Sequence, residues 1–213
     1  MNPSVLVRTL GLQDYQSTWQ AMQTFTENRI DNTCDEIWLL EHPPVFTQGH
    51  AGKAEHILNP LNIPVVATDR GGQVTYHGPG QLIAYLLTDL RRAQLTIRDF
   101  VCMIENAVID CLKEKGIEAH PRRDAPGVYV KDAKIASLGL RVKRGCSYHG
   151  LALNVAMDLT PFSQINPCGM KNLSMTQVSV FEPKATVSEI GQRWLHYFTQ
   201  QMRYNPSYDN TKS

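Results

Sequence analysis

Apolar side chains recur near the start of the chain at the spacing of a helix that is buried on one side. Tyr15, Trp19, Met22 and Phe25 follow one another at intervals of four and three residues. Side chains at these intervals form one stripe along a helix, and such a stripe normally packs on a core. The pattern therefore predicts a helix over Asp14–Asn28 with this stripe facing inward.

Two more helices are marked by residues that suit an N-terminal cap. Thr96 stands three positions before Asp99, and Thr186 stands three positions before Glu189, which is the spacing of a capping box. Apolar residues at helical intervals follow both caps, and Gly116 is placed to end the first of these two helices. We expect both helices to pack one face against the core.

Strand patterns outnumber helix patterns. Short runs rich in β-branched and aromatic residues predict strands at Ser4–Val7, Glu36–Leu40, Val65–Thr68, Gln81–Leu87, Gly127–Val130, Lys134–Val142 and Gly150–Val155. A short polar turn joins the fifth run to the sixth, so we expect an antiparallel hairpin there. The sequence predicts one domain over residues 1–213, of α/β class in the α+β sense, with a mixed and largely antiparallel sheet flanked by helices. We expect a frayed tail after Tyr204.

Composition limits the partners that the chain can have. Lys and Arg total 21 and Asp and Glu total 20, so no bulk charge draws the protein to nucleic acid or to a membrane. We find no signal-peptide pattern and no run of about 18 apolar residues, and we expect a cytoplasmic protein. The five irregularly spaced cysteines favour free thiols. Three basic doublets are candidates for a local positive patch, and we expect at least one of them to be an ordinary solvated pair: Arg91-Arg92, Arg122-Arg123 and Lys143-Arg144.

The segment Arg70–Gln81, RGGQVTYHGPGQ, is unusually rich in glycine. Glycines weaken regular structure, and core packing does not require so many in one place. They allow backbone N–H groups to approach a ligand, while Arg70 can bind an anion or a carbonyl and His77 can serve as acid, base or donor. A turn between strands is the purely structural alternative. The segment matches neither a P-loop nor a dinucleotide fingerprint, so it does not indicate a nucleotide site.

Lys134 and Cys168 stand out for their surroundings in the sequence. Lys134 shares a predicted strand face with apolar residues, so it is either a surface lysine at a strand start or a partly desolvated ammonium beside a site. Cys168 lies in the rigid loop sequence Asn-Pro-Cys-Gly, which can hold a thiol on a sharp turn. Cys146 and His149 have the spacing of a zinc-ligand pair, but no second pair accompanies them, so we expect no metal.

Taken together, these segments resemble the lipoyl(octanoyl) transferase family of lipoate biosynthesis. Four motifs carry the resemblance: RGGQVTYHGPGQ from Arg70, KIASLGLR from Lys134, HGLALNV from His149, and NPCG around Cys168. They stand in the family's order and spacing and span nearly the whole chain, with no departure at the key positions.

The resemblance implies a transferase that moves an octanoyl group from octanoyl-acyl carrier protein to a lysine of lipoyl domains, in 2-oxoacid dehydrogenase complexes and the glycine cleavage H protein. Cys168 would be the thioester nucleophile and Lys134 its partner in a Cys/Lys dyad, without cofactor or metal. The implied fold is that of biotin and lipoate protein ligase catalytic domains, and we expect a monomer. The implied substrate-binding residues are Arg70, Gly71, Gly72, Gln73, Val74, Thr75, Tyr76, His77, Ser137, Leu138, Gly139, Gly150, Leu151 and Ala152.

The residue chemistry is consistent with this interpretation. A thiol with the usual pKa near 8.5 is only a few per cent thiolate at pH 7, so a nucleophilic cysteine needs a nearby cation or base. Exchange of one thioester for another is nearly balanced in energy and needs no ATP. Lys134 would accept the proton of the incoming amine, which leaves His77 and His149 to organise the pocket. Two alternatives stay open: an ATP-dependent ligase of the same fold that does not require Cys168, and a non-catalytic binder of carrier domains.

Overall fold

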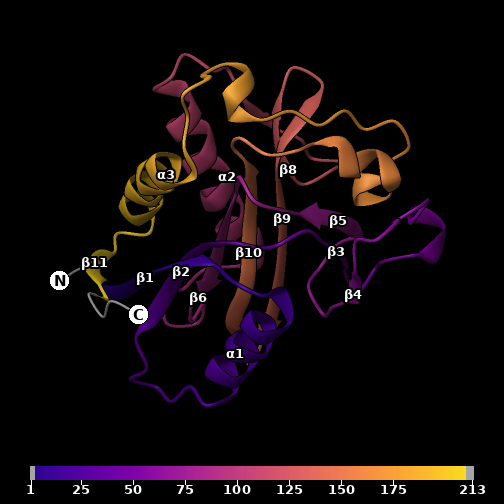
Figure 1. Cartoon of the computed structure of the whole chain (residues 1–213). Helices are drawn as coiled ribbons and strands as arrows, with labels where there is room; N and C mark the ends of the chain where they lie inside the picture. Colours follow the sequence, from indigo (N-terminus) through magenta and orange to yellow (C-terminus); the bar gives the residue numbers. More distant parts are fainter. Residues whose placement is uncertain (1–2, 210–213) are drawn as a thin grey trace.

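The computed structural model describes residues 3–209 and is built around one large, strongly twisted sheet (Figure 1). Its strands are β1 (Ser4–Leu12), β2 (Asp35–Glu41), β6 (Gln81–Leu87), β7 (His120–Pro121), β8 (Gly127–Val130), β9 (Ala133–Lys143), β10 (Cys146–Asn154) and β11 (Asn205–Tyr208). Their order is β11-β1-β2-β6-β10-β9-β8-β7. β1 is parallel to β2 and to β11, and the remaining neighbours are antiparallel. The predicted mixed, largely antiparallel sheet is confirmed.

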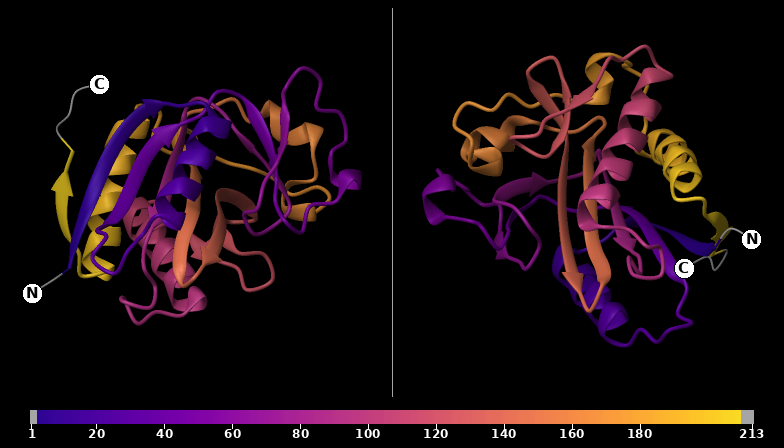
Figure 2. Two further views of the ribbon diagram at one scale, coloured as in Figure 1. Left: turned by 90° about the horizontal axis from the view of Figure 1, so that it is seen from below. Right: turned by 180° about the vertical axis from the view of Figure 1, so that it is seen from behind.

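The central strands are buried on both faces because helices cover each side (Figure 2). The helices are α1 (Tyr15–Glu27), α2 (Ile97–Lys113) and α3 (Val187–Gln201). Alternate residues of β2 point to opposite sides: Ile37 joins the core under α2 and α3, whereas Trp38 joins the core under α1. The middle of β2, residues 37–40, and most of β6, residues 82–87, are therefore continuously apolar rather than alternating with polar residues.

All three predicted helices are confirmed, and so are the predicted N-caps at Thr96 and Thr186. Asp14 caps α1 through its side chain, and Thr96 forms a full capping box with Asp99 at the start of α2. Thr186 accepts a hydrogen bond from the backbone N–H of Glu189 at the start of α3, at 3.2 Å. Along residues 3–209, no helix combines the length and hydropathy needed to cross a bilayer.

A second, three-stranded sheet lies to one side of β9 and β10 (Figure 1). It has the order β4-β3-β5, with β3 at Val45–Gln48, β4 at Val65–Ala67 and β5 at Val74–His77. The sequence predicts no strand within the glycine-rich segment Arg70–Gln81, and β5 in its middle corrects that prediction. Val74 and Tyr76 form β5 because they pack with Phe46 of β3 in a core that belongs to this small sheet.

The predicted hairpin of β8 and β9 is confirmed, whereas the predicted frayed tail is wrong up to Tyr208. Asn205–Tyr208 forms β11, which pairs in parallel with the N-terminal strand β1. Residues 210–213 lie outside the described part of the chain. A four-residue strand that contains Pro206 has little local strand signal, and an edge position is where a proline is tolerated. The pairing depends on a partner at the opposite end of the sequence.

Candidate active site

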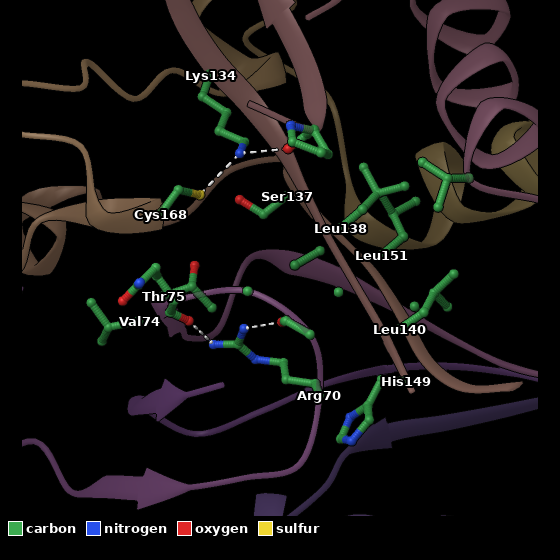
Figure 3. Close-up of a pocket in the computed structure, with 18 of the residues that line it drawn as sticks. Arg70, Val74, Thr75, Lys134, Ser137, Leu138, Leu140, His149, Leu151 and Cys168 are labelled. Carbon is green, nitrogen blue, oxygen red and sulfur yellow. Dashed lines mark hydrogen bonds between the residues drawn. The ribbon is translucent and has the colours of Figure 1, made fainter. Parts of the chain in front are cut away.

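A cavity of about 390 Å³ lies between β9, β10 and the glycine-rich segment Arg70–Gln81. Its volume is in the range typical of small-ligand sites, which is roughly 300–1,000 Å³. The walls include residues from each motif singled out in the sequence, with Lys134 and Cys168 among them. Figure 3 shows these two side chains pointing toward each other at one end of the cavity, with Arg70 and His149 toward the other end.

Lys134 is buried, with only 1% of its surface exposed. Its ammonium donates hydrogen bonds to the Cys168 sulfur at 3.0 Å and to the carbonyl oxygen of Pro126 at 2.8 Å (Figure 3). The ammonium also lies 5.4 Å from the centre of the Tyr129 ring, close enough for a cation–π interaction. The alternative of an ordinary surface lysine is therefore wrong, because the end of the Lys134 side chain is held out of water against the Cys168 sulfur.

Backbone pairing fixes Lys134 next to the segment that carries Cys168. The Lys134 N–H donates to the Ser174 carbonyl at 2.8 Å, and the Thr176 N–H donates to the Lys134 carbonyl at 2.9 Å. These bonds form a short parallel bridge opposite Met175. The chain that follows the cysteine is thus attached directly to the strand that carries the lysine.

Cys168 occupies a turn that a cysteine rarely adopts. Its φ of 57° lies in the left-handed region, within the short 3₁₀ turn η3 (Pro167–Gly169). Gly169 donates to the Asn166 carbonyl at 2.9 Å and Met170 donates to the Pro167 carbonyl at 3.0 Å, so the turn is held by its own backbone. Strained conformations of this kind cost about 1–3 kcal/mol and occur mostly where function requires them.

These hydrogen bonds narrow the choice of amides that can stabilise an oxyanion. The N–H groups of Gly169 and Met170 are already bonded to carbonyls of the turn. The N–H of Gly71 donates to the Leu140 carbonyl at 2.9 Å. An oxyanion site must therefore use other donors near the sulfur.

Apolar side chains and two close backbones shape the rest of the cavity. Leu138 and Leu151 line one wall (Figure 3). The glycine-rich segment crosses β9 so closely that a Cβ on Gly139 would lie 3.0 Å from the Gly71 oxygen, and a Cβ on Gly71 would lie 3.1 Å from the Leu140 oxygen. Glycine at both positions allows this contact, which closes the cavity over an apolar channel.

Arg70 binds the protein itself through most of its guanidinium. It donates to the Thr47 side chain and carbonyl, to the Gly71 carbonyl at 2.9 Å and to the Gln73 carbonyl at 2.8 Å. Burial lowers the pKa of Arg70, while the nearby Tyr15 and Cys168 groups act in the opposite direction. The arginine thus shapes the glycine-rich segment and leaves a buried positive charge near the cavity.

The histidines at the far end of the cavity are neutral. Burial lowers the pKa of His77 well below its usual value, and its two ring nitrogens contact Gln81 at 2.8 Å and Thr47 at 3.2 Å. Burial also lowers the pKa of His149, although Asp69 accepts from it at 3.0 Å. Both rings are bonded within the protein, which agrees with the expected role as organisers of the pocket.

Asp69 connects α1 with β10 through side-chain hydrogen bonds. Burial disfavours its charge, but hydrogen bonds from His149, Tyr148 and Trp19 outweigh this and hold the pKa of Asp69 below its usual range. Trp19 belongs to α1 and donates at 2.8 Å, whereas Tyr148 and His149 belong to β10. The residue next to Arg70 in sequence is therefore tied to both a helix and the main sheet.

A cluster of aromatic rings and histidines supports the cavity floor. His42 contacts the Gln13 carbonyl through Nδ1 at 2.6 Å and the Tyr85 hydroxyl through Nε2 at 2.7 Å. Because a carbonyl can only accept, Nδ1 carries the proton and Nε2 accepts from Tyr85. Burial lowers the pKa of His42 to about 4. Tyr15 and His77 stack on each other with ring centroids 6.0 Å apart, and both rings meet His42 edge to face.

Of the residues implied to bind substrate, Tyr76 alone is absent from the cavity wall. Its ring packs between Phe46 and Phe162, on the core of the small sheet, with both centroids at 5.5 Å. The geometry therefore does not support contact between Tyr76 and a substrate in this cavity. Strand alternation in β5 accounts for the difference, because Tyr76 and its neighbours Thr75 and His77 point to opposite sides.

The structure adds cavity residues that sequence reasoning did not identify. Tyr15, Ile83 and Tyr85 contribute from α1 and β6, and Ile97 contributes from the start of α2. The segment Asp124–Pro126 completes the wall beside Lys134. The Pro-Gly sequence before a predicted strand was the only local signal for that segment, and it indicates a turn rather than a site.

The basic doublets differ in their availability to a partner. Arg91 is paired with Asp89 and Arg92 with Asp35, and Lys143 is paired with Glu27. Arg122 is likewise paired, with Asp124 at 2.6 Å. Arg122 and Arg123 directly precede the cavity-lining residues from Asp124. This last doublet is the one that lies closest in sequence to the cavity wall. In the described range 3–209, no group of three or more His, Cys, Asp or Glu side chains is arranged to hold a metal ion.

Comparisons with known proteins agree with this geometry. The family model of the lipoyl protein ligase A/B catalytic domain matches residues 14–199. A protein from Marinobacter nauticus named octanoyltransferase is 64% identical over 189 residues, covering 89% of each chain. An octanoyltransferase from Escherichia coli is 57% identical over 205 residues, covering 96% of each chain.

Solved structures show the same fold at low sequence identity. A lipoate-protein ligase A bound with ATP superimposes with a TM-score of 0.76 at 16% identity, covering 98% of this chain and 89% of that one. The biotin protein ligase from Aquifex aeolicus gives 0.56 at 10% identity, covering 94% of this chain and 69% of that one. The implied relation to lipoate and biotin protein ligase folds is therefore confirmed.

Proposed function

The chain belongs to the family of lipoyl protein ligase A/B catalytic domains, and we propose that within it Cys168 carries an octanoyl group as a thioester between two protein partners. Its octanoyltransferase relatives make it an acyltransferase that acts in protein lipoylation. The proposed donor is octanoyl-acyl carrier protein. The proposed acceptors are lysines on lipoyl domains of 2-oxoacid dehydrogenase complexes and of the glycine cleavage H protein.

The contact of 3.0 Å between the Lys134 ammonium and the Cys168 sulfur carries the proposal. A positive charge that is itself desolvated stabilises a thiolate more strongly than a solvated one would. The cysteine lies at the end of an apolar cavity, where Leu138 and Leu151 can contact an aliphatic chain. This arrangement supports the proposed roles of Cys168 as nucleophile, of Lys134 as its charge partner and of the cavity as an acyl pocket.

In the first half-reaction, the Cys168 sulfur attacks the thioester carbonyl of the donor. A new carbon–sulfur bond forms to Cys168, and the bond from the carbonyl to the donor's sulfur breaks. Cys168 reacts as a thiolate because its proton already resides on Lys134, and the Lys134 ammonium gives that proton to the departing donor thiolate, which leaves Lys134 as a neutral amine. One thioester replaces another, so no ATP is consumed.

In the second half-reaction, the acceptor lysine attacks the Cys168 thioester as a free amine. The carbon–nitrogen bond forms, the carbon–sulfur bond breaks, and the amine loses a proton. Lys134 is the base that lies next to the reacting sulfur and can accept this proton. The amide product leaves Cys168 free for another cycle.

Two further features support this assignment. The cysteines are all free, which agrees with a reducing compartment such as the cytoplasm. Arg122 and Arg123 directly precede the cavity-lining Asp124 in sequence, and positive charge at that place would speed the encounter with an acidic carrier domain. We propose that the enzyme acts as a monomer, with both partners approaching this side in turn.

Intact-protein mass spectrometry tests the proposal directly. The enzyme is mixed with octanoyl-acyl carrier protein in the absence of ATP and acceptor, then treated with hydroxylamine and mapped by peptides. We expect one hydroxylamine-labile octanoyl group on Cys168. Cys168→Ala should take up none, whereas the matched variant Cys102→Ala, which alters an exposed thiol, should be acylated normally.

A different result would redirect the assignment. Transfer to an acceptor without any adduct on Cys168, or transfer that requires ATP, would replace the thioester scheme with that of an ATP-dependent ligase. Binding of both carriers without transfer, unchanged in Cys168→Ala, would indicate a non-catalytic binder.

A further inference from the structure

Glu105 is a buried carboxylate that the proposed mechanism does not use. It lies on α2 with 7% of its surface exposed. Its Oε1 accepts a hydrogen bond from the backbone N–H of Gly127 at 2.8 Å. Burial raises the pKa of Glu105, while the Gly127 N–H and the charge of Lys134 act in the opposite direction. A buried carboxylate is costly to keep, so its contacts require an explanation.

Glu105 and Lys134 bind opposite ends of the same peptide group, the one between Pro126 and Gly127. The Pro126 carbonyl and the Gly127 N–H belong to a single peptide unit. The carbonyl accepts from the Lys134 ammonium at 2.8 Å, and the N–H donates to Glu105. An unbroken series of hydrogen bonds therefore runs from Glu105 through this peptide and Lys134 to the sulfur of Cys168.

Because a peptide bond is planar, Glu105 can control the direction of the Pro126 carbonyl from the opposite side of the peptide. The carbonyl and the N–H of a trans peptide point in opposite directions, so holding one end fixes the direction of the other. Glu105 holds the N–H end and thereby aims the Pro126 oxygen at the lysine. A carboxylate at the N–H end also polarises the peptide and makes that oxygen a better acceptor.

Gly127 is shaped to let the lysine approach this peptide. Its φ is 141°, a conformation that other residues rarely adopt. A Cβ there would lie 2.4 Å from the Lys134 Cε and 2.6 Å from the Ala136 oxygen. The lysine stem therefore passes directly over the peptide whose orientation Glu105 sets. A turn of this peptide would displace the Lys134 side chain.

We propose that Glu105 is a positioning residue for the Cys168–Lys134 pair and acts through the Pro126–Gly127 peptide. Without it, the Gly127 N–H is a buried donor with no acceptor, and the peptide turns to find one. The Pro126 oxygen then leaves the lysine, whose ammonium is no longer directed at the sulfur. This inference rests on the thioester chemistry proposed for Cys168.

The experiment compares three variants with the wild-type enzyme. Glu105→Ala removes the acceptor, whereas Glu105→Gln keeps an oxygen that can accept from Gly127 but removes the charge. Val108→Ala, on the same helix in the main core, serves as a matched control for loss of packing. Octanoyl transfer gives kcat and KM, a thermal melt monitors folding, and iodoacetamide labelling at pH 7 with peptide mapping reports the reactivity of Cys168.

We expect Glu105→Ala to lower kcat by about 30- to 100-fold with little change in KM for the octanoyl donor, because the reacting groups are misplaced but the cavity is intact. Its Cys168 should be labelled several times more slowly than in the wild type. Glu105→Gln should recover kcat to within about fivefold of the wild type, because the hydrogen bond is retained. Val108→Ala should melt at a lower temperature but keep kcat and labelling near the wild type.

Three results would overturn the inference. The first is a wild-type kcat in Glu105→Ala, and the second is an equal loss of kcat in Glu105→Gln and Glu105→Ala. The third is a loss of kcat in Val108→Ala equal to that in Glu105→Ala when the two variants have the same melting temperature. Cys168→Ala, measured in the same assay, separates this failure from failure of the proposed function. An active Cys168→Ala enzyme removes the thioester scheme itself. If Cys168→Ala is inactive but Glu105→Ala has wild-type kcat, only the proposed role of Glu105 is refuted.

Discussion

The neutral His42 makes the stability of the fold sensitive to acid. In the folded protein its pKa is lowered to about 4, because burial disfavours the imidazolium. In the unfolded chain the same ring has a pKa near 6.5. Above pH 6.5 both states carry a neutral ring and the stability is fully present. As the pH falls from about 6.5 toward 4, only the unfolded state takes up the proton, so stability is lost across that window.

The size of the loss follows from the two pKa values. At pH 5 the unfolded ring is almost fully protonated and the folded ring almost fully neutral, so the free energy of unfolding falls by about 2 kcal/mol from this residue alone. By pH 4 the loss reaches about 3 kcal/mol. The ring is fully buried, so solvent screening does not reduce these figures. A typical domain has only about 5–15 kcal/mol of stability, which makes this loss readily measurable.

His42→Gln provides the matched comparison. A glutamine amide can donate to the Gln13 carbonyl and accept from Tyr85, but it does not titrate. Urea unfolding, followed by tryptophan fluorescence, gives the free energy of unfolding of both proteins at pH 7 and pH 5. The buried His77 and His149 and the carboxylate of Asp69 are present in both, so their contributions cancel in the difference between the two pH-dependent losses.

We expect wild-type protein to lose about 2 kcal/mol more than His42→Gln between pH 7 and pH 5. The comparison is made within each protein, so a lower stability of the variant at pH 7 does not affect it. Parallel losses in the two proteins would refute the reasoning, because they would mean that His42 is protonated equally in the folded and unfolded states.

Two further predictions concern the charge partner of the thiol. Lys134→Arg keeps a cation near Cys168, but arginine cannot serve as a base near neutral pH. Acylation of Cys168 should therefore persist in part, while transfer to the acceptor amine falls by about 100-fold or more, as single-turnover measurements of the two steps would show. An equal loss in both steps would leave Lys134 with only an electrostatic role. Gly127→Ala places a Cβ 2.4 Å from the Lys134 Cε and 2.6 Å from a backbone oxygen, so octanoyl transfer should fall by about tenfold or more. Full activity in a correctly folded Gly127→Ala enzyme would show that the lysine does not need its observed path.

Local sequence signals were sufficient for the helices and for most strands. The caps at Thr96 and Thr186 depend on residues three positions away, and such short-range bonds can be recognised without tertiary structure. Strand β11 was missed for the opposite reason, since its partner is at the far end of the chain. The strand inside the glycine-rich segment was missed because its core is formed by Phe46, which belongs to another element.

The candidate site shows the same division. The motifs around Cys168 and Lys134 and the glycines indicated which segments meet, and the structure brings them around one cavity. The burial of Lys134 was undecidable locally, because a lysine at a strand start faces water unless another segment covers it. Glu105 gave no signal at all, because its partner is the backbone N–H of a residue 22 positions away. Nearly every residue has such an N–H, so the sequence does not distinguish this one.

The short parallel bridge between Lys134 and the chain after Cys168 bears on how an acyl group travels. Ser174 and Thr176 bind the backbone of Lys134 on both sides of Met175, only a few residues beyond the cysteine. The thiol therefore has no arm on which to swing away from the lysine. If the proposed route holds, every movement during a cycle belongs to the two carriers, which bring their flexible ends to a stationary sulfur and withdraw them again. The acyl group then stays at one place on the enzyme between the two steps, and the sequence of the steps depends on which carrier protein is bound at the cavity.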